Sequence, residues 1–109
     1  MRSYSETLSL VTLFAEGWKQ RFGNHVAKVM LIGSYARGDY REDSDIDVVV
    51  LLKESSSDLR DRIYDYWTDF LVEHEFDIAL KLLDQTTFHH WKQLKDPFSL
   101  SVESEGIAV

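Results

Sequence analysis

The chain contains no cysteine and a single proline, and its apolar residues never form a long uninterrupted run. Without cysteine there is no disulfide, no thiolate nucleophile and no thiolate metal site. No apolar run approaches the roughly 20 residues that a helix needs to cross a bilayer. The N-terminal stretch MRSYSETLSL meets Glu6 before it forms an apolar signal core. These absences predict a soluble, cytoplasmic protein that does not bind membranes.

Positive charge is also scarce. The 12 basic residues are outnumbered by 19 acidic ones, which gives a formal net charge of −7. Because a broad electrostatic grip on nucleic acid normally needs a basic face, we expect no direct nucleic-acid binding. A nucleotide that enters as a metal complex is not excluded. The 109 residues, of which 44% are hydrophobic, predict one domain over residues 1–109 with a real core.

Helical periodicity marks two long segments. Leu8, Val11, Ala15 and their successors form one apolar stripe, which predicts a helix over residues 5–22. The serines of ESSSD are suited to cap a second helix over residues 57–72. The stretch TTFHHWKQLK, residues 86–95, predicts a short helix that ends before Asp96 and Pro97, since a residue before proline disfavours helix.

Three apolar segments predict strands. They are HVAKVMLIG (residues 25–33), DIDVVVLL (residues 45–52) and EFDIALKLL (residues 75–83). The second is apolar at every position from Val48 on, so it is expected at the centre of the sheet with both faces buried. The tail FSLSVESEGIAV is expected to carry a last strand at its end. The predicted fold class is α/β, an α+β sandwich with a small mixed or antiparallel sheet of three to four strands flanked by helices.

A pair of aspartates stands at the start of the second predicted strand. Asp45 and Asp47 are two residues apart, so they share a face with Cα atoms about 6.6 Å apart. Like charges that converge there repel unless a cation lies between them, and Mg²⁺ prefers carboxylate oxygens together with substrate phosphates. The alternative is a set of solvated charges at a strand edge. The neighbouring Glu42 and Asp43 are interpreted as solvated loop charges.

A third carboxylate lies in the third predicted strand. Alternation places Phe76 and Ile78 on one face and Asp77 on the other. An acid within an apolar strand is costly unless it is paired or metal-bound. If this strand lies beside the second one, Asp77 can reach Asp45 and Asp47. The alternative is a partly exposed carboxylate at a sheet edge.

Gly33 and Ser34 form a strand-to-helix turn upstream of the aspartates. Ser34 is expected to cap a short helix over YAR, and Gly38 to take a left-handed conformation at its end. Backbone N–H groups at such a turn bind anions, and glycine allows a phosphate to approach closely. Plain helix capping by Ser34 is the alternative. Arg37 and Arg41 are candidates to clamp phosphate or to balance the aspartates. Together with the acids, this turn would grip a nucleoside triphosphate and its metal.

These motifs resemble a known family. Gly33-Ser34, ten residues and then Asp45-Ile46-Asp47 match the G-S-x10-D-x-D signature of the polymerase-β-like nucleotidyltransferases. The stretch GSYARGDYREDSDIDVVV resembles the minimal nucleotidyltransferase group in particular, over nearly the whole chain. The resemblance implies the nucleotidyltransferase fold, with Asp45 and Asp47 as Mg²⁺ ligands and Asp77 as a third carboxylate that helps to deprotonate the acceptor hydroxyl.

The resemblance also implies ATP as the nucleotide and two Mg²⁺ ions. Gly33 and Ser34 would contact its triphosphate, and Arg37, the arginine of the A-R-G element, would contact phosphate or support the turn. The final stretch ESEGIAV departs from the family pattern, where a fuller last strand is expected.

Many members of this group are antitoxins that form a hetero-oligomer with a HEPN-domain RNase toxin. The resemblance implies that the chain transfers AMP from ATP to a tyrosine hydroxyl of such a toxin. Two other functions stay open. One is nucleotidyl transfer to a small-molecule hydroxyl, although such enzymes usually carry a second domain for the acceptor. The other is an antitoxin that neutralises its toxin by contact alone.

Overall fold

The protein is described by a computed structural model that covers residues 3–41 and 45–109. Glu42 and Asp43, which were expected to be solvated loop charges, lie outside the described residues. The helices and strands are α1 (Tyr4–Phe22), β1 (Val26–Ile32), α2 (Ser34–Arg37), β2 (Asp47–Leu52), α3 (Ser57–His74), β3 (Ala79–Asp84), α4 (Gln85–Gln93), α5 (Pro97–Glu105) and β4 (Ile107–Ala108). This order contains every element that the sequence predicted, together with α5, which it did not predict.

The strands form one mixed sheet in the order β3-β2-β1-β4. β1 runs antiparallel to both β2 and β4, whereas β2 and β3 are parallel. β2 is therefore an inner strand, and its residues from Val48 to Leu52 are all buried. The expected mixed sheet of three to four strands and the central position of this strand are confirmed.

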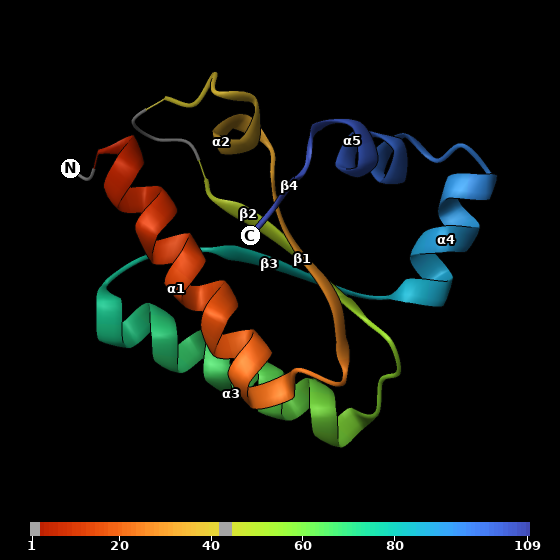
Figure 1. Cartoon of the computed structure of the whole chain (residues 1–109), viewed down its shortest axis with the longest axis horizontal. Coiled ribbons are helices and arrows are strands. Elements are labelled where there is room, and N and C mark those ends of the chain that lie inside the picture. Colours follow the sequence, from red (N-terminus) through yellow and green to blue (C-terminus); the bar gives the residue numbers. More distant parts are fainter. Residues whose placement is uncertain (1–2, 42–44) are drawn as a thin grey trace.

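The two faces of the sheet carry separate layers of helix. Val48, Val50 and Leu52 point to one face and belong to the core cluster that also contains buried residues of α1 and α3. Val49 and Leu51 point to the other face and pack with residues of α4 and α5. We call these the α1/α3 face and the α4/α5 face. Figure 1 shows α1 and α3 on one side of the strands and α4 and α5 on the other.

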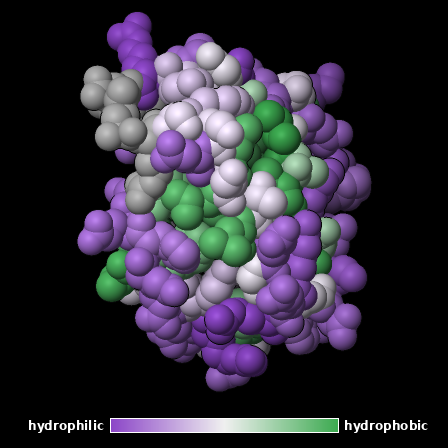
Figure 2. All heavy atoms as spheres, turned by 60° about the vertical axis from the view of Figure 1, so that its left-hand side comes forward, coloured by the Kyte–Doolittle hydropathy of each residue, from purple (hydrophilic) through white to green (hydrophobic). Residues whose placement is uncertain are grey.

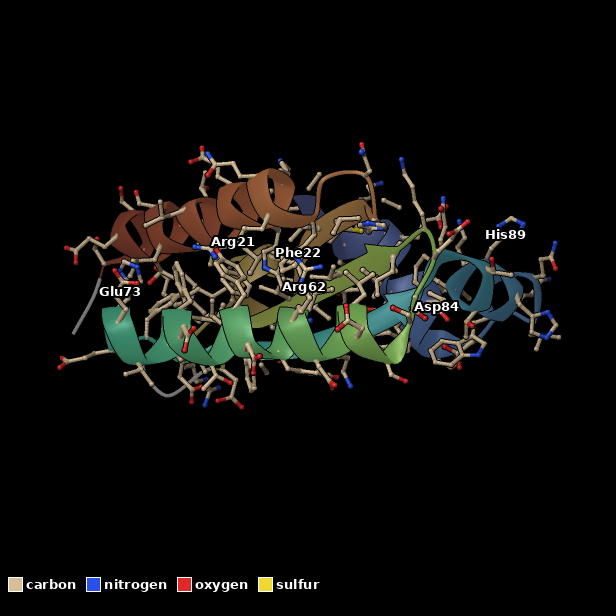
Figure 3. All side chains as sticks on the ribbon, turned by 90° about the horizontal axis from the view of Figure 1, so that it is seen from below. Arg21, Phe22, Arg62, Glu73, Asp84 and His89 are labelled. Atoms are coloured by element: carbon tan, nitrogen blue, oxygen red, sulfur yellow. The ribbon has the colours of Figure 1, made fainter. Side chains whose placement is uncertain are left out.

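The helices α1 and α3 are closely joined. The hydroxyl of Tyr66 on α3 donates a hydrogen bond of 3.0 Å to the carbonyl of Phe14 on α1. A Cβ at Gly17 would collide with this hydroxyl, so the close approach requires glycine there. The guanidinium of Arg21 lies 4.8 Å from the centre of the Tyr66 ring, and that of Arg62 lies 5.7 Å from the Phe22 ring. Figure 3 shows Arg21, Phe22 and Arg62 between the two helices.

The ends of three predicted elements differ from the structure. β3 begins at Ala79 rather than at residue 75, because Glu75 takes a left-handed conformation (φ 49°) that ends α3. β2 begins at Asp47 rather than at Asp45. Ser34 does not cap α2: Gly33 occupies the cap position and Ser34 is the first helical residue. The left-handed conformation expected at Gly38 is confirmed.

The helix α5 was missed. Asp96 caps it by accepting a hydrogen bond of 3.0 Å from the backbone N–H of Ser99, and Pro97 stands at its start. Aspartate followed by proline is also a signal for the beginning of a helix. Backbone N–H groups in the first turn have no partner within the helix, so a proline, which lacks this N–H, fits there without the loss of a hydrogen bond. The sequence analysis used Pro97 only as the end of the preceding helix. The short last strand is confirmed as β4.

Candidate active site

The candidate site lies where β2 and β3 begin side by side. Asp47 is the pairing partner of Ala79, and the backbone N–H of Ala79 donates a hydrogen bond of 2.7 Å to the carbonyl of Ile46. Asp45 precedes Asp47 by two residues, and Asp77 precedes Ala79 by two residues. The parallel pairing of the two strands begins at Asp47 and Ala79, and alternation with Val49 places Asp47 on the α4/α5 face. Asp45 and Asp77 lie on the segments that lead into these two strands.

The three carboxylates differ in exposure. Asp45 and Asp77 are exposed, whereas Asp47 is half-buried. Burial raises the pKa of Asp47, the negative charge of Asp45 raises it further, and the positive charge of Lys81 lowers it in part. Asp47 is thus held in surroundings that disfavour its charge, and a cation bound beside it would reverse this effect.

The turn that precedes α2 touches this aspartate. Gly33 has φ 75° and ψ −155°, a conformation that is essentially restricted to glycine. A Cβ added at Gly33 would lie 2.8 Å from Oδ2 of Asp47. A side chain at this position would fill the space directly in front of the carboxylate. The predicted phosphate turn and the predicted metal ligand are therefore neighbours in the structure.

Ser34 and Arg37 lie on α2, the one-turn helix that follows. Ser34 is partly buried, and its carbonyl accepts hydrogen bonds from the N–H groups of Gly38 and Asp39. Arg37 is exposed and forms ion pairs of 3.2 Å with Asp39 and 3.3 Å with Glu105 of α5. These hydrogen bonds raise the pKa of Arg37. Arg37 thus ties the turn to α5, while its contact with phosphate stays a prediction.

Three tyrosines hold the turn against α1. The rings of Tyr4, Tyr35 and Tyr40 are nearly parallel to one another, and the centre of the Tyr40 ring lies 5.0 Å from that of Tyr4 and 4.7 Å from that of Tyr35. The hydroxyl of Tyr4 also donates a hydrogen bond of 3.1 Å to the carbonyl of Tyr35. This stack was not predicted from the sequence. It forms only because α1 packs against the turn, and the spacing of the three tyrosines in the chain gives no signal for it.

Two further residues near the carboxylates were also missed. The indole N–H of Trp67 on α3 donates a hydrogen bond of 2.8 Å to the carbonyl of Ile78, which fixes the backbone directly after Asp77. Lys81 lies on the α4/α5 face two residues beyond Ala79, where its charge interacts with Asp47. Strand alternation counted on from Asp77 places Lys81 on the same face, so a signal for this residue was present in the sequence.

The chemistry of this donor set fits a hard divalent cation. Carboxylate oxygens are its preferred ligands, burial and the negative charge of Asp45 raise the pKa of Asp47, and the Gly33 turn leaves room in front of that carboxylate. In the part of the chain that the structure describes, no three His, Cys, Asp or Glu side chains stand close enough to form a ready metal cluster. The roles of Asp45, Asp47 and Asp77 as ligands therefore remain predictions.

The fold and the site together define an α/β domain of the nucleotidyltransferase class. The model of the nucleotidyltransferase domain family matches residues 11–105, and the chain belongs to this family. It is 31% identical over 93 residues to a "putative protein adenylyltransferase" of Methanocaldococcus jannaschii, covering 85% of this chain and 87% of that protein. It is also 31% identical over 81 residues to the protein adenylyltransferase MntA of Thermococcus cleftensis, covering 74% and 80%.

Solved structures show the same fold. A crystal structure of a "putative nucleotidyltransferase" from Sulfolobus solfataricus superposes with a TM-score of 0.62 at 24% identity, covering 96% of this chain and 80% of that one. A mutant of the MntA–HpeT toxin–antitoxin pair superposes with a TM-score of 0.54 at 15% identity, covering 100% and 72%. The expected nucleotidyltransferase fold is confirmed. None of the helices among residues 3–41 and 45–109 is long and apolar enough to span a membrane.

Proposed function

We propose that the protein is a Mg²⁺-dependent protein adenylyltransferase and an antitoxin. It would transfer AMP from ATP to a tyrosine hydroxyl of a cognate HEPN-domain RNase toxin in the cytoplasm, with release of pyrophosphate. The observation that carries the proposal is the contact of the Gly33 turn with Asp47, because it joins the predicted triphosphate site to a predicted metal ligand. The two relatives that are named protein adenylyltransferases support a protein as the acceptor.

The residues would share the reaction as follows. Asp45, Asp47 and Asp77 would hold two Mg²⁺ ions, and these ions would supply positive charge that stabilises the charge developing during the transfer. The turn at Gly33 and Ser34 would bind the β- and γ-phosphates, with Arg37 beside it. The tyrosine oxygen attacks the α-phosphorus, the bond from this phosphorus to the pyrophosphate oxygen breaks, and Asp77 accepts the hydroxyl proton. The products are the adenylylated tyrosine and pyrophosphate.

The partner and the reaction are tested together. A HEPN-domain RNase toxin that co-purifies with this chain is incubated with it, Mg²⁺ and ATP labelled at the α-phosphate. Label is expected on the toxin, and the double variant Asp45→Asn, Asp47→Asn is expected to lose at least about a thousandfold in transfer rate. The matched control is Asp61→Asn, Asp69→Asn, which removes two exposed acids from α3 and should transfer label normally.

Two outcomes would favour the other functions. If the Asp45→Asn, Asp47→Asn variant folds and still protects cells from the toxin as well as the wild type does, contact alone neutralises the toxin. If label passes to hydroxylated antibiotics without a protein partner, the acceptor is a small molecule.

Nucleotide binding is checked separately. Mg²⁺ with ATP should raise the melting temperature of the wild type, since a ligand that binds only the native state stabilises it. An unchanged melting curve at saturating nucleotide would contradict a working site.

A further inference from the structure

The α4/α5 face of the sheet contains a cavity far from the aspartates. Its volume is about 530 Å³, which is in the range of small-molecule sites. The cavity is lined from four elements, by Lys28, Met30, Leu51, Gln85, Thr86, Phe88, His89, Lys92 and Glu103. The proposed function uses none of these residues.

Strand register places the cavity at the opposite end of the face from the candidate active site. Asp47 pairs with Ile32 at one end of β1 and β2, whereas Leu51 pairs with Lys28 at the other end. Four residues of strand separate Asp47 from Leu51, a distance of about 13 Å.

The floor of the cavity is apolar. Met30, Leu51 and Phe88 are each buried to more than nine-tenths and belong to the core cluster of the α4/α5 face. Phe88 presents an aromatic side chain to this space from α4. A flat apolar group would find packing partners here on the sheet and on the helix.

The rim of the cavity is positively charged in a chain of net negative charge. The rim contains two lysines, Lys28 and Lys92, and a single acid, Glu103. Glu103 forms an ion pair of 2.8 Å with Lys92. This hydrogen bond lowers the pKa of Glu103, and the charges of Lys28 and His89 lower it further. The ammonium groups of Lys28 and Lys92 thus act on the same small space, and Glu103 neutralises them in part.

We propose that this cavity binds a small organic anion with a flat apolar body, whose carboxylate or phosphate group lies against Lys28 and Lys92. The apolar body packs on Met30, Leu51 and Phe88. This site is separate from the one where nucleotidyl transfer is proposed, and its occupancy does not depend on that reaction.

The test uses 1-naphthoate, an aromatic carboxylate, and the uncharged 1-naphthamide as its matched partner. Binding is followed by NMR on protein labelled at the methionine methyl groups, where the Met30 signal reports the floor of the cavity. We expect 1-naphthoate to shift this signal saturably and to bind about tenfold more tightly than the amide, because the acid alone forms charged hydrogen bonds. Equal affinity of the two probes would overturn the proposal.

Substitutions in the rim should change the affinity for 1-naphthoate in opposite directions. Lys28→Gln, Lys92→Gln should weaken 1-naphthoate binding about tenfold, and Lys95→Gln, which lies outside the lining, should leave it unchanged. Glu103→Gln should strengthen binding by about twofold to fivefold, because it removes the competing negative charge. This second variant keeps the test decisive if the double lysine variant is unstable. Unchanged affinity in the Glu103 variant and the double lysine variant would contradict an anion site.

The site is also distinguished from the active site. The Asp45→Asn, Asp47→Asn variant should bind 1-naphthoate with wild-type affinity at Met30. Loss of the Met30 shift in this variant would show that binding of the probe depends on the aspartates, which would overturn the distal site and leave the proposed transferase function untouched. Retained binding together with absent AMP transfer in the wild type would contradict the transferase function alone.

Discussion

The two faces of the sheet differ in how their side chains are packed and in whether they carry charged groups. On the α1/α3 face, Val48, Val50 and Leu52 are covered by two long helices and enclosed in one large core. On the α4/α5 face, the same strand begins with the half-buried Asp47 and continues with Val49 and Leu51 under two helices of nine residues each. A single strand with alternating side chains thus anchors the fold on one face and positions charged groups on the other. The difference suggests that substitutions on the two faces should have separable effects on stability and on activity.

Figure 2 shows the outer surface on the side where α1 begins and α3 ends, with an apolar patch surrounded by hydrophilic side chains. Exposed apolar residues on these helices include Leu13 and Val72, of which Val72 is 75% exposed. The α1/α3 layer is therefore buried against the sheet and also presents apolar side chains outward.

Among single substitutions that compare the two faces, the largest expected effect is on activity, at Gly33. Gly33→Ala places a Cβ 2.8 Å from the Asp47 carboxylate at a backbone conformation that alanine avoids. Displacement of this carboxylate should reduce AMP transfer about a hundredfold, since small errors of position at a reacting centre have effects of that size. The rate of label transfer from ATP measures it.

Gly38→Ala is the matched control for this prediction. Gly38 also has a positive φ, 84°, but among the described residues, its two chain neighbours apart, no atom lies within 4 Å of the position of its Cβ. It should lose about 1 kcal/mol of unfolding free energy through backbone strain and keep most of its transfer rate. Equal losses of activity in the two variants would contradict a specific role of the Gly33–Asp47 contact.

The next effect is on stability and compares the two faces directly. Val50 and Val49 are neighbours on β2, and both are fully buried. Val50→Ala should lower the free energy of unfolding by about 2 kcal/mol and Val49→Ala by about 1 kcal/mol, because the cost of a cavity depends on how well the site can collapse. The short helices α4 and α5 can move into the space more easily than α1 and α3. Urea unfolding measures both, and a larger loss in Val49→Ala would contradict this view of the faces.

Much of this fold is predictable from local sequence signals. Apolar periodicity identified α1 and α3, and the uninterrupted run from Val48 identified the inner strand. The predicted start of β3 at residue 75 was wrong. Phe76 and Ile78 alternate with polar residues as in a strand, but Glu75 forms the end of α3. The missed α5 had a usable signal in Asp96 and Pro97.

The site is less accessible to sequence reasoning. The spacing of Gly33, Asp45 and Asp47 predicted one site, and in the structure the Gly33 turn after β1 lies next to the carboxylate of Asp47. The parallel pairing of β2 with β3, which places the strand after Asp77 beside the strand that begins at Asp47, is determined by no local pattern. The distal cavity combines side chains from β1, β2, α4 and α5, so only the packed structure brings them together.

A smaller effect is expected at the hydrogen bond between the helices of the α1/α3 face. Tyr66→Phe removes the hydroxyl that bonds to Phe14 and should cost about 1 kcal/mol of unfolding free energy. Burial raises the pKa of Tyr66. Because the pKa of the Tyr66 hydroxyl is higher in the folded than in the unfolded protein, the neutral hydroxyl stabilises the fold. This contribution is fully present below the unfolded pKa of about 10 and is lost as the pH rises through the folded pKa. The wild type should therefore lose more stability above pH 10 than Tyr66→Phe does.

Tyr64→Phe is the control for that measurement. Tyr64 lies on the same helix and is 42% exposed. Its variant should unfold at the wild-type urea concentration and keep the wild-type response to alkaline pH. If Tyr64→Phe and Tyr66→Phe behaved alike, the link between α1 and α3 would not depend on the buried hydroxyl.

The smallest effect is expected at the corresponding link on the α4/α5 face, the surface ion pair between Lys92 and Glu103. Its hydrogen bond lowers the pKa of Glu103, so its contribution is present above the unfolded pKa and is lost as the pH falls through the folded value. The stability difference between wild type and Glu103→Gln should therefore shrink as the pH falls below about 4. It should also shrink in 1 M salt, since exposed charges are screened. Thermal unfolding at several pH values and salt concentrations measures this, and a difference that is independent of both would show that α4 and α5 are joined by packing rather than by charge.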